Sequence, residues 1–370
     1  MIYNWQQADW PDFKYNVSEL EDIMFPFAEE TGLVTGMMNA MPEESQTETL
    51  ISLMVSEAIK TSEIEGEYFN RQDVVSSIRN HLGLNRVPEK IKSPGALGIG
   101  QLMIHIRNSF AEPLSEKTLF TWHKMLMKGN NQIKAGQWRS HAEPMQVVSG
   151  VAGKEKIHFE APPSTQVPKE MKTFIAWFNA TAPGGSKEIR NAPIRSAIAH
   201  IYFESIHPFE DGNGRIGRAI AEKSLSQTLG RPVLLSLSKT IEADKKLYYS
   251  ALERGSRNNE ITAWIKYFVN TVLTAQRQAR QLISFTLKKV KFFDRYKDLM
   301  NERQLKVARR MFDAGPEGFE GGMSAAKYES LTKVSKATAT RDLQHLSDIK
   351  ALIPEGGGRS TRYVLNFEGL

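Results

Sequence analysis

Cysteine is absent from the 370-residue sequence, and no apolar run approaches the length of a membrane span. Without cysteine the chain cannot form disulfide bonds or use a thiolate, which fits a reducing compartment. A transmembrane helix needs about 20 consecutive apolar residues, so we expect no contact with a membrane. The initial stretch MIYNWQQADWPDF lacks the basic and apolar regions of a secretory signal. These absences predict a cytoplasmic protein.

A strong excess of one charge is also missing. The net charge is +6, which weakly favours the binding of nucleotides or nucleic acid. A positive excess of this size is more often spread over the surface of a soluble protein. Hydrophobic residues make up 41% of the chain and charged residues 24%, so the composition is that of an ordinary globular protein with a real core. The length favours roughly two or three domains.

Helical periodicity dominates the sequence. Apolar residues recur at spacings of three and four over 47–81, 114–127 and 188–206, which predicts helices. Ser115 is the expected N-cap of the second, with Leu119, Trp122 and Leu126 on one face. The third is expected to bury Ile194, Ile198, Ile201 and Tyr202. The sequence therefore predicts a mainly α-helical fold.

Residues 136–163 differ from this pattern. They predict two short strands, around Met145–Val148 and Lys156–Phe159, joined by a glycine-containing turn and ended by Pro162 and Pro163. A lone hairpin is only marginally stable unless it packs on something. It is either a plain connector or an edge that pairs with another chain.

The stretch HPFEDGNGRIGR, from His207 to Arg218, concentrates polar residues and glycines between two predicted helices. Pro208 ends the first helix, and the second begins near Asn213. A helix start offers unpaired N–H groups, and adjacent glycines let an anion approach the backbone. Arg215 and Arg218 lie three residues apart and share a face. Together these features predict a site for a polyphosphate.

Two further residues of this stretch suit phosphate chemistry. A polyphosphate usually carries Mg²⁺, and Asp211 is placed to be its carboxylate ligand. His207 is the side chain best suited to accept a proton near neutral pH. A base beside an activated phosphate indicates transfer to a hydroxyl group. The spacing is neither that of a P-loop nor that of a dinucleotide-binding fingerprint.

The same stretch resembles the Fic family, whose signature is HPFx[D/E]GNGRxxR, and it matches every fixed position. The similarity extends to the preceding RSAIAHIYFESI and to the following helices as far as about residue 270. The resemblance implies a helical Fic core and transfer of AMP from ATP to a Ser, Thr or Tyr hydroxyl of a target protein. Self-modification is a variant of the same activity.

The resemblance also implies a role for each polar residue of the motif. His207 is the base that activates the hydroxyl, and Asp211 orients Mg²⁺, the implied cofactor. The phosphates of ATP are held by Gly212, Asn213, Gly214, Arg215 and Arg218.

Two other segments resemble parts of Fic proteins. The hairpin resembles the flap that pairs with the target's backbone, and its pairing residues here are Val147, Val148, Lys156, Ile157 and His158. The segment ADKKLYYSALERGS resembles the lining of the adenine pocket, with Tyr248 or Tyr249 against the nucleotide. Some relatives have an asparagine further on, whereas Gly255 and Ser256 precede Asn258 here. This departure leaves open another donor, such as a different nucleotide or a phosphocholine conjugate.

An inhibitory motif lies upstream, in KTSEIEGEYFN. Thr61, Glu65 and Gly66 match the family's [S/T]xxxE[G/N] pattern, which implies an N-terminally autoinhibited class. Glu65 is expected to pair with Arg218 and to misplace the α-phosphate of ATP. In some relatives the equivalent glutamate helps to remove AMP, so the reverse reaction also stays open.

The tail, residues 301–370, resembles a winged helix-turn-helix. Three predicted helices (ERQLKVARRMF, SAAKYESL and SKATATRDLQHLSD) precede a strand–turn–strand wing. Ser335 is the expected cap of the third helix, with Ala339, Leu343 and Leu346 facing inward. Candidate DNA contacts are Thr338, Thr340, Arg341, Arg359 and Arg362. However, 11 Lys and Arg against 9 Asp and Glu leave the tail only weakly basic. DNA binding and a contact between proteins, including a homodimer, therefore remain equal alternatives.

These interpretations predict three regions. Residues 1–93 form an N-terminal arm and inhibitory-helix region, 94–285 the Fic catalytic core, and 286–370 a linker helix with the winged helix-turn-helix. The expected function is that of an autoinhibited protein adenylyltransferase. The alternatives are a DNA-binding transcriptional regulator whose core senses ATP, and a Fic enzyme that uses another donor or removes AMP.

Overall fold

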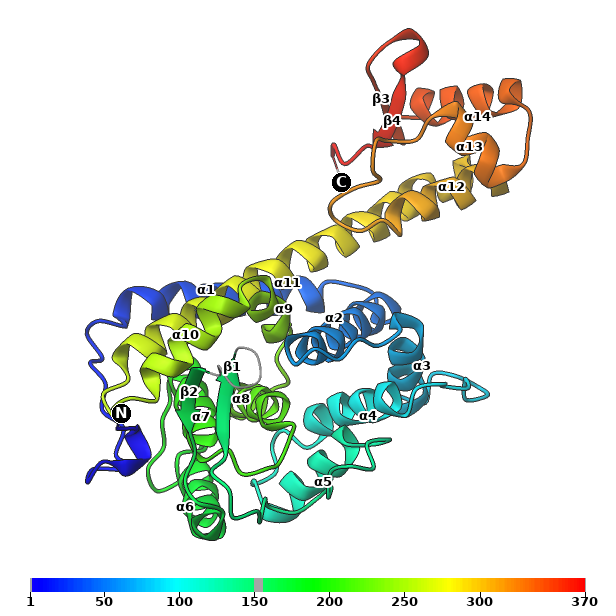
Figure 1. Ribbon diagram of the computed structural model, residues 1–370. Helices are drawn as coiled ribbons and strands as arrows, with labels where there is room; N and C mark the ends of the chain where they lie inside the picture. The colour runs from blue at the N-terminus through cyan, green and yellow to red at the C-terminus, as the bar shows by residue number, and fades with distance from the viewer. Residues whose placement is uncertain (1, 150–155, 370) are drawn as a thin grey trace. The chain divides into compact units, whose positions relative to one another are not determined.

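The computed structural model describes residues 2–149 and 156–369 and is predominantly helical (Figure 1). Its strands form two small antiparallel sheets, each of two strands. The predicted mainly α-helical fold is therefore confirmed. The helices are α1 (Glu21–Asn39), α2 (Glu43–Ile64), α3 (Arg71–His81), α4 (Pro94–Asn108), α5 (Glu116–Leu126), α6 (Val167–Ala180), α7 (Ala192–Ile206), α8 (Asn213–Leu229), α9 (Leu237–Ala243), α10 (Lys245–Gly255), α11 (Thr262–Tyr296), α12 (Glu302–Phe312), α13 (Ala325–Thr332) and α14 (Lys336–Asp348). The strands are β1 (Gln146–Ser149), β2 (Lys156–Glu160), β3 (Leu352–Glu355) and β4 (Arg362–Leu365).

The chain divides into two compact units. One comprises Met1–Gly32 and Leu50–Arg277, and the other comprises Leu33–Thr49 and Gln278–Leu370. Within the ranges that the structure describes, no helix combines the length and the apolar character needed to cross a membrane.

The helix expected over 47–81 is two helices, which corrects that prediction. The first, α2, ends at Ile64, and Gly66 follows in the left-handed region with φ +80°. This conformation strains any residue with a side chain, so glycine ends the helix there. Asn70 then caps α3 by accepting hydrogen bonds from the N–H groups of Gln72 and Asp73. The apolar periodicity continues across the break and hides it.

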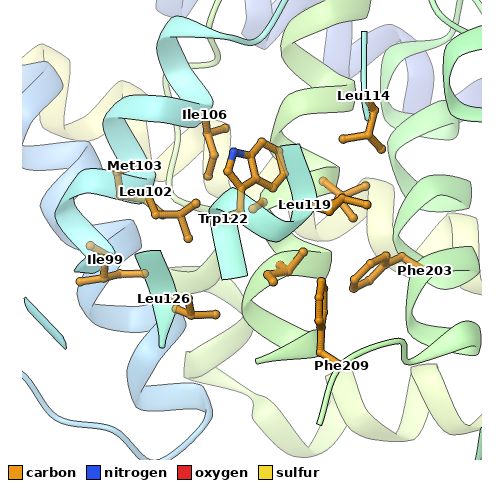
Figure 2. Close-up of a cluster of buried hydrophobic side chains, with 14 of the residues drawn as sticks. Ile99, Leu102, Met103, Ile106, Leu114, Leu119, Trp122, Leu126, Phe203 and Phe209 are labelled. Carbon is orange, nitrogen blue, oxygen red and sulfur yellow. The ribbon is translucent and has the colours of Figure 1, made fainter. Parts of the chain in front are cut away.

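The core of the larger unit surrounds α7, whose residues are almost all buried, including the four predicted to face inward. Figure 2 shows Trp122 and Leu119 of α5 between side chains of α4 and the aromatic rings of Phe203 and Phe209. The Trp122 indole, fully buried, donates to Nδ1 of His105 at 3.0 Å. Ser115 caps α5 as predicted, by accepting from the N–H of Thr118. This packing fixes the end of α7, where the site begins.

The predicted hairpin is present as β1 and β2, which pair antiparallel with Val147 opposite Phe159. The register shifts between Val147 and Val148, so the ladder contains an irregularity there. The N-terminal segment supports the hairpin: the ring of Tyr3 packs edge-on against Phe159 at 5.1 Å, and Trp5 Nε1 donates to the Glu160 carbonyl at 2.7 Å. The predicted turn lies outside the described residues.

The smaller unit contains α12, α13 and α14 followed by the β3–β4 hairpin, in the predicted order. Ser335 caps α14, and Ala339, Leu343 and Leu346 are buried, as expected. Asp342 lies on the buried face of this helix, where its carboxylate accepts from the Tyr328 hydroxyl at 2.9 Å and pairs with the Arg303 guanidinium. A winged helix-turn-helix stays a prediction for this unit.

Candidate functional site

The loop between α7 and α8 has a conformation that its own sequence dictates. Its first residue, His207, ends α7 in the left-handed region with φ 50° and ψ 59°. The Asn213 side chain accepts from the N–H of Phe209 at 2.9 Å and donates to the Phe209 carbonyl at 2.8 Å. Gly212 has φ +81°, and a side chain there would collide with Leu126 and Met127. The Asn213 amide therefore braces the loop, and its backbone N–H lies at the start of α8.

Arg139 holds the other side of this loop. Its guanidinium is buried and donates from Nε to the His207 carbonyl at 2.8 Å, while its backbone N–H donates to the Pro208 carbonyl at 2.9 Å. Burial lowers the pKa of Arg139 to about 10, so the side chain stays charged at neutral pH. Sequence reasoning missed this residue, because nothing local connects it to a loop 68 positions away.

A second histidine, His123, supports the loop from α5. Its Nδ1 accepts from the N–H of Gly136 at 2.9 Å, so Nε2 carries the proton and donates to the Asp211 carbonyl at 3.2 Å. The ring stacks on Phe209 with centroids 4.1 Å apart. Burial lowers the pKa of His123 to about 4, which keeps the imidazole neutral at physiological pH. This histidine is therefore a structural support.

His207 itself faces a carboxylate that sequence reasoning missed. Its Nδ1 lies 3.6 Å from Oε2 of Glu204, one turn earlier on α7. The two side chains are only 17% and 11% exposed. Burial would raise the pKa of Glu204, but His207, His200 and Arg218 outweigh it and hold that pKa below its ordinary value. Glu204 is therefore a buried anion beside the candidate base.

The start of α8 combines several features that suit an anion. The first-turn N–H groups of a helix have no partner within it, and they lie at the positive end of its dipole. Asp211, whose side chain is 46% exposed, accepts from the N–H of Gly212 at 2.6 Å and lies 3.6 Å from the Arg215 guanidinium. Arg215 and Arg218 are both buried at the base of the same turn. A phosphate placed here would meet N–H donors and two guanidinium groups.

Both arginines are paired with carboxylates from the turn that follows α2. Glu67 lies 2.6 Å from Nη1 of Arg215, and Glu65 lies 2.8 Å from Nη2 of Arg218. The same Nη2 also donates to the Thr61 carbonyl at 2.9 Å, and Nε donates to the Thr61 hydroxyl at 2.8 Å. Burial alone would lower the pKa of Arg218, but the nearby carboxylates outweigh it and raise that pKa above its ordinary range. The structure thus brings together the motif residues of α2 and α8.

The carboxylate of Glu65 also lies directly against the start of α8. A side chain built on Gly214 would collide with Oε1 of Glu65. Gly66 makes the turn that directs the chain there, with the N–H of Glu67 donating to the Ser62 carbonyl at 3.0 Å. Negative charge from α2 therefore occupies the region where the sequence predicts phosphate.

The two tyrosines of α10 have different environments. Tyr248 is buried, and its hydroxyl lies 2.9 Å from Nε2 of His200. Tyr249 is 42% exposed, packs on Tyr248 at 5.3 Å, and has its hydroxyl 3.5 Å from the Ile64 carbonyl at the end of α2. Burial raises the pKa of Tyr249 to about 12, so its phenol is neutral. Tyr249 is the tyrosine with a face available to a ligand.

The predicted pairing residues of the hairpin divide into anchored and exposed ones. Val148 and Ile157 are 48% and 42% exposed. His158 is anchored to α10, since its Nδ1 lies 2.8 Å from the Glu253 carboxylate and its carbonyl accepts from Arg257 at 2.9 Å. The remaining two, Val147 and Lys156, are half-buried and exposed, respectively. The hairpin is thus joined to the helix that carries Tyr249.

Comparisons with known proteins agree with this geometry. Residues 113–225 match the Fic/DOC family model, so this stretch is a Fic/DOC domain, and residues 3–84 match a domain of unknown function, DUF4172. The chain is 26% identical over 168 residues to a probable protein adenylyltransferase of Aquifex aeolicus. That alignment covers 43% of this chain and 47% of the relative, so the chain spans about half of the relative's length.

Solved structures show the same fold. A Fic family protein from Desulfovibrio desulfuricans G20 aligns over 94% of this chain and 97% of its own, with a TM-score of 0.53 and 19% identity. A Fic domain containing signaling protein from Bacteroides thetaiotaomicron aligns over 71% of this chain and 97% of its own, with a TM-score of 0.52 and 16% identity. The predicted Fic-type helical fold is therefore confirmed.

Proposed function

We propose that this protein transfers AMP from ATP to a hydroxyl group of a target protein, and that Glu65 restrains the transfer. The observation that carries the proposal is the arrangement around the α7–α8 loop. It combines a histidine at the end of one helix, a carboxylate in the loop, and two buried arginines at the start of the next helix. The relative named a probable protein adenylyltransferase supports the same activity.

The reaction requires one bond to form and one to break. The hydroxyl oxygen of the target attacks the α-phosphorus, and the bond from that phosphorus to the oxygen bridging to the β-phosphate breaks. His207 accepts the hydroxyl proton, and pyrophosphate leaves with the bridging oxygen. The N–H groups at the start of α8 and the guanidinium groups of Arg215 and Arg218 hold the phosphates. Tyr249 offers its exposed ring to the base of the nucleotide.

Asp211 fits the role of a magnesium ligand. Mg²⁺ usually takes one or two protein carboxylates and completes its shell with water and phosphate oxygens. Asp211 provides one half-exposed carboxylate. The described residues contain no group of three or more side chains that could hold a metal by themselves. Bound with ATP, Mg²⁺ would neutralise charge on the phosphates.

The hairpin is the proposed contact for the target. It has exposed apolar side chains at Val148 and Ile157, and its backbone edge can pair with an extended segment of another chain. A segment held in this way would present a Ser, Thr or Tyr hydroxyl, and self-modification would use a segment of a second copy.

Transfer of label from ATP to protein tests this function. The Glu65→Gly variant is incubated with Mg²⁺, a lysate and ATP labelled at either the α- or the γ-phosphate. We expect label on protein from α-labelled ATP only, and its loss when EDTA removes Mg²⁺. Label from the γ-position would instead indicate phosphoryl transfer. Intact ATP binding without any label would contradict nucleotidyl transfer and favour a different donor or an ATP sensor.

A second proposal concerns the smaller unit, whose three helices and hairpin have the order of a winged helix-turn-helix. Thr340 and Arg341 are exposed on α14, and Lys336 is exposed at its start, so this face could contact DNA. A gel shift of the wild type with duplex DNA at low and moderate salt distinguishes the alternatives. A salt-sensitive complex would favour DNA, whereas a concentration-dependent dimer without a shifted band would favour contact between proteins.

A further inference from the structure

We infer that Glu204 is a positioning residue of the site, whose carboxylate keeps the proton of His207 on Nδ1 and leaves Nε2 free to accept the hydroxyl proton. The inference rests on the proposed function for the role of His207 as a base. A neutral imidazole carries one proton, and the partner of one nitrogen decides which nitrogen carries it. If the proton of His207 lay on Nε2, that nitrogen could not accept the hydroxyl proton.

The geometry of α7 directs the two groups toward each other. Glu204 precedes His207 by three residues, and positions three apart share one face of a helix. The left-handed conformation of His207 ends the helix while Nδ1 remains 3.6 Å from Oε2 of Glu204. This separation is longer than a hydrogen bond. Catalytic hydrogen bonds are often long without substrate and shorten when it binds.

The other groups near Glu204 leave His207 as its partner. His200 lies one turn earlier on α7, but its Nε2 is 2.9 Å from the Tyr248 hydroxyl and its ring stacks on Trp264 at 5.7 Å. Burial lowers the pKa of His200, so this ring is neutral. Arg218 contributes positive charge, but its guanidinium bonds to Thr61 and Glu65. His207 is the neighbouring histidine with Nδ1 directed at the carboxylate.

The cost of burying Glu204 also indicates a specific role. An ionised carboxylate in the interior is unfavourable unless charges and hydrogen bonds compensate it. Oε1 of Glu204 has no hydrogen-bond partner within the described residues. Gly217 leaves room for this oxygen, because a side chain there would collide with it. A carboxylate held with one free oxygen beside a histidine suits an orienting group better than a core-filling one.

Nitrogen NMR of the histidines tests the inference directly. The wild-type protein is labelled with ¹⁵N-histidine, and the His207 signals among the eight histidines are identified by their loss in His207→Gln. We expect the neutral ring to carry its proton on Nδ1, and Glu204→Gln to move part of the population to Nε2. Ser205→Ala is the matched control, since it removes the 2.7 Å hydrogen bond to Asn4 from the same helix but leaves the carboxylate. Its His207 signals should match the wild type.

Kinetics provide the second readout. In the Glu65→Gly protein, Glu204→Gln should lower kcat by about 10- to 100-fold, with the KM for ATP unchanged, and Glu204→Asp should recover part of the loss. A wild-type His207 protonated on Nε2 would overturn the inference even if Glu204→Gln fails to fold. Unchanged kcat and unchanged His207 signals in Glu204→Gln would also overturn it. The NMR result does not depend on transfer activity. Failure of the proposed function can therefore be distinguished from failure of this inference.

Discussion

Replacement of His207 by alanine in the Glu65→Gly protein is expected to lower the rate of AMP transfer by about 100- to 10,000-fold, the usual contribution of a general base. Alanine removes the proposed acceptor of the hydroxyl proton, but it leaves the N–H groups of α8 and both arginines in place. ATP should therefore bind with nearly unchanged affinity. The measurement is the initial rate of label transfer from α-labelled ATP, with ATP binding measured by calorimetry on the same preparation.

A second histidine serves as the control for this experiment. His81 lies exposed at the end of α3, where its Nδ1 is 2.7 Å from the Ser77 carbonyl, and it has no part in the site. His81→Ala should keep the full transfer rate. A His207→Ala protein that transfers AMP at the rate of its parent would contradict the assignment of the base. Loss of ATP binding in His207→Ala would show instead that the loop had collapsed.

Features that depend on neighbouring residues could be predicted from the sequence. The cap of α5 at Ser115, the cap of α14 at Ser335 and the start of α8 at Asn213 all involve contacts within a few residues. The hairpin strands were likewise placed to within about one residue of their observed ends, because their pattern is local. The sequence does not predict the local break between α2 and α3, because apolar residues recur on both sides of Gly66.

Features that depend on distant residues could not be predicted in the same way. Arg139 and His123 support the loop from segments 68 and 88 positions away, and neither belongs to a recognisable motif. Glu204 is close in sequence, but α7 is buried on nearly every side, so periodicity gives no reason to single out one of its polar residues. The sequence also gives no indication that the Asn213 amide bonds to both backbone groups of Phe209, and its contact with phosphate stays a prediction.

The region that matches a domain of unknown function contributes directly to this site. Residues 3–84 include Thr61, Glu65 and Glu67, which contact the two arginines of α8. They also include Tyr3 and Trp5, which hold strand β2 of the hairpin. The proposed phosphate-binding residues and the proposed target-binding edge therefore both contact this N-terminal region. A Fic/DOC domain cut at residue 113 would lack both contributions.

Removal of the Glu65 carboxylate is expected to have the second large effect on the transfer rate. Glu65→Gly should raise the transfer rate by about 10- to 100-fold, since correct placement of a reacting atom is worth a factor of this order. The substitution frees Nη2 of Arg218 from its 2.8 Å ion pair and removes negative charge from the start of α8. The wild type and the variant are compared at saturating ATP and Mg²⁺. The effect should appear in kcat, because Glu65 is proposed to misplace the α-phosphate, and also in ATP affinity, because ATP gains the freed guanidinium.

The same substitution should also change stability in a way that depends on ATP. Removing one partner of a buried ion pair leaves the other charge poorly compensated, so Glu65→Gly should melt at a lower temperature than the wild type without nucleotide. ATP supplies negative charge to the freed guanidinium, and a ligand that binds only the folded state raises its stability. The rise in Tm on adding ATP and Mg²⁺ should therefore be larger in Glu65→Gly than in the wild type.

Glu63→Gly is the matched control for both effects, because Glu63 lies two residues before Glu65 but pairs with Lys60 at 2.6 Å. An equal activation by Glu63→Gly would mean that loosening α2, rather than releasing Arg218, removes the restraint.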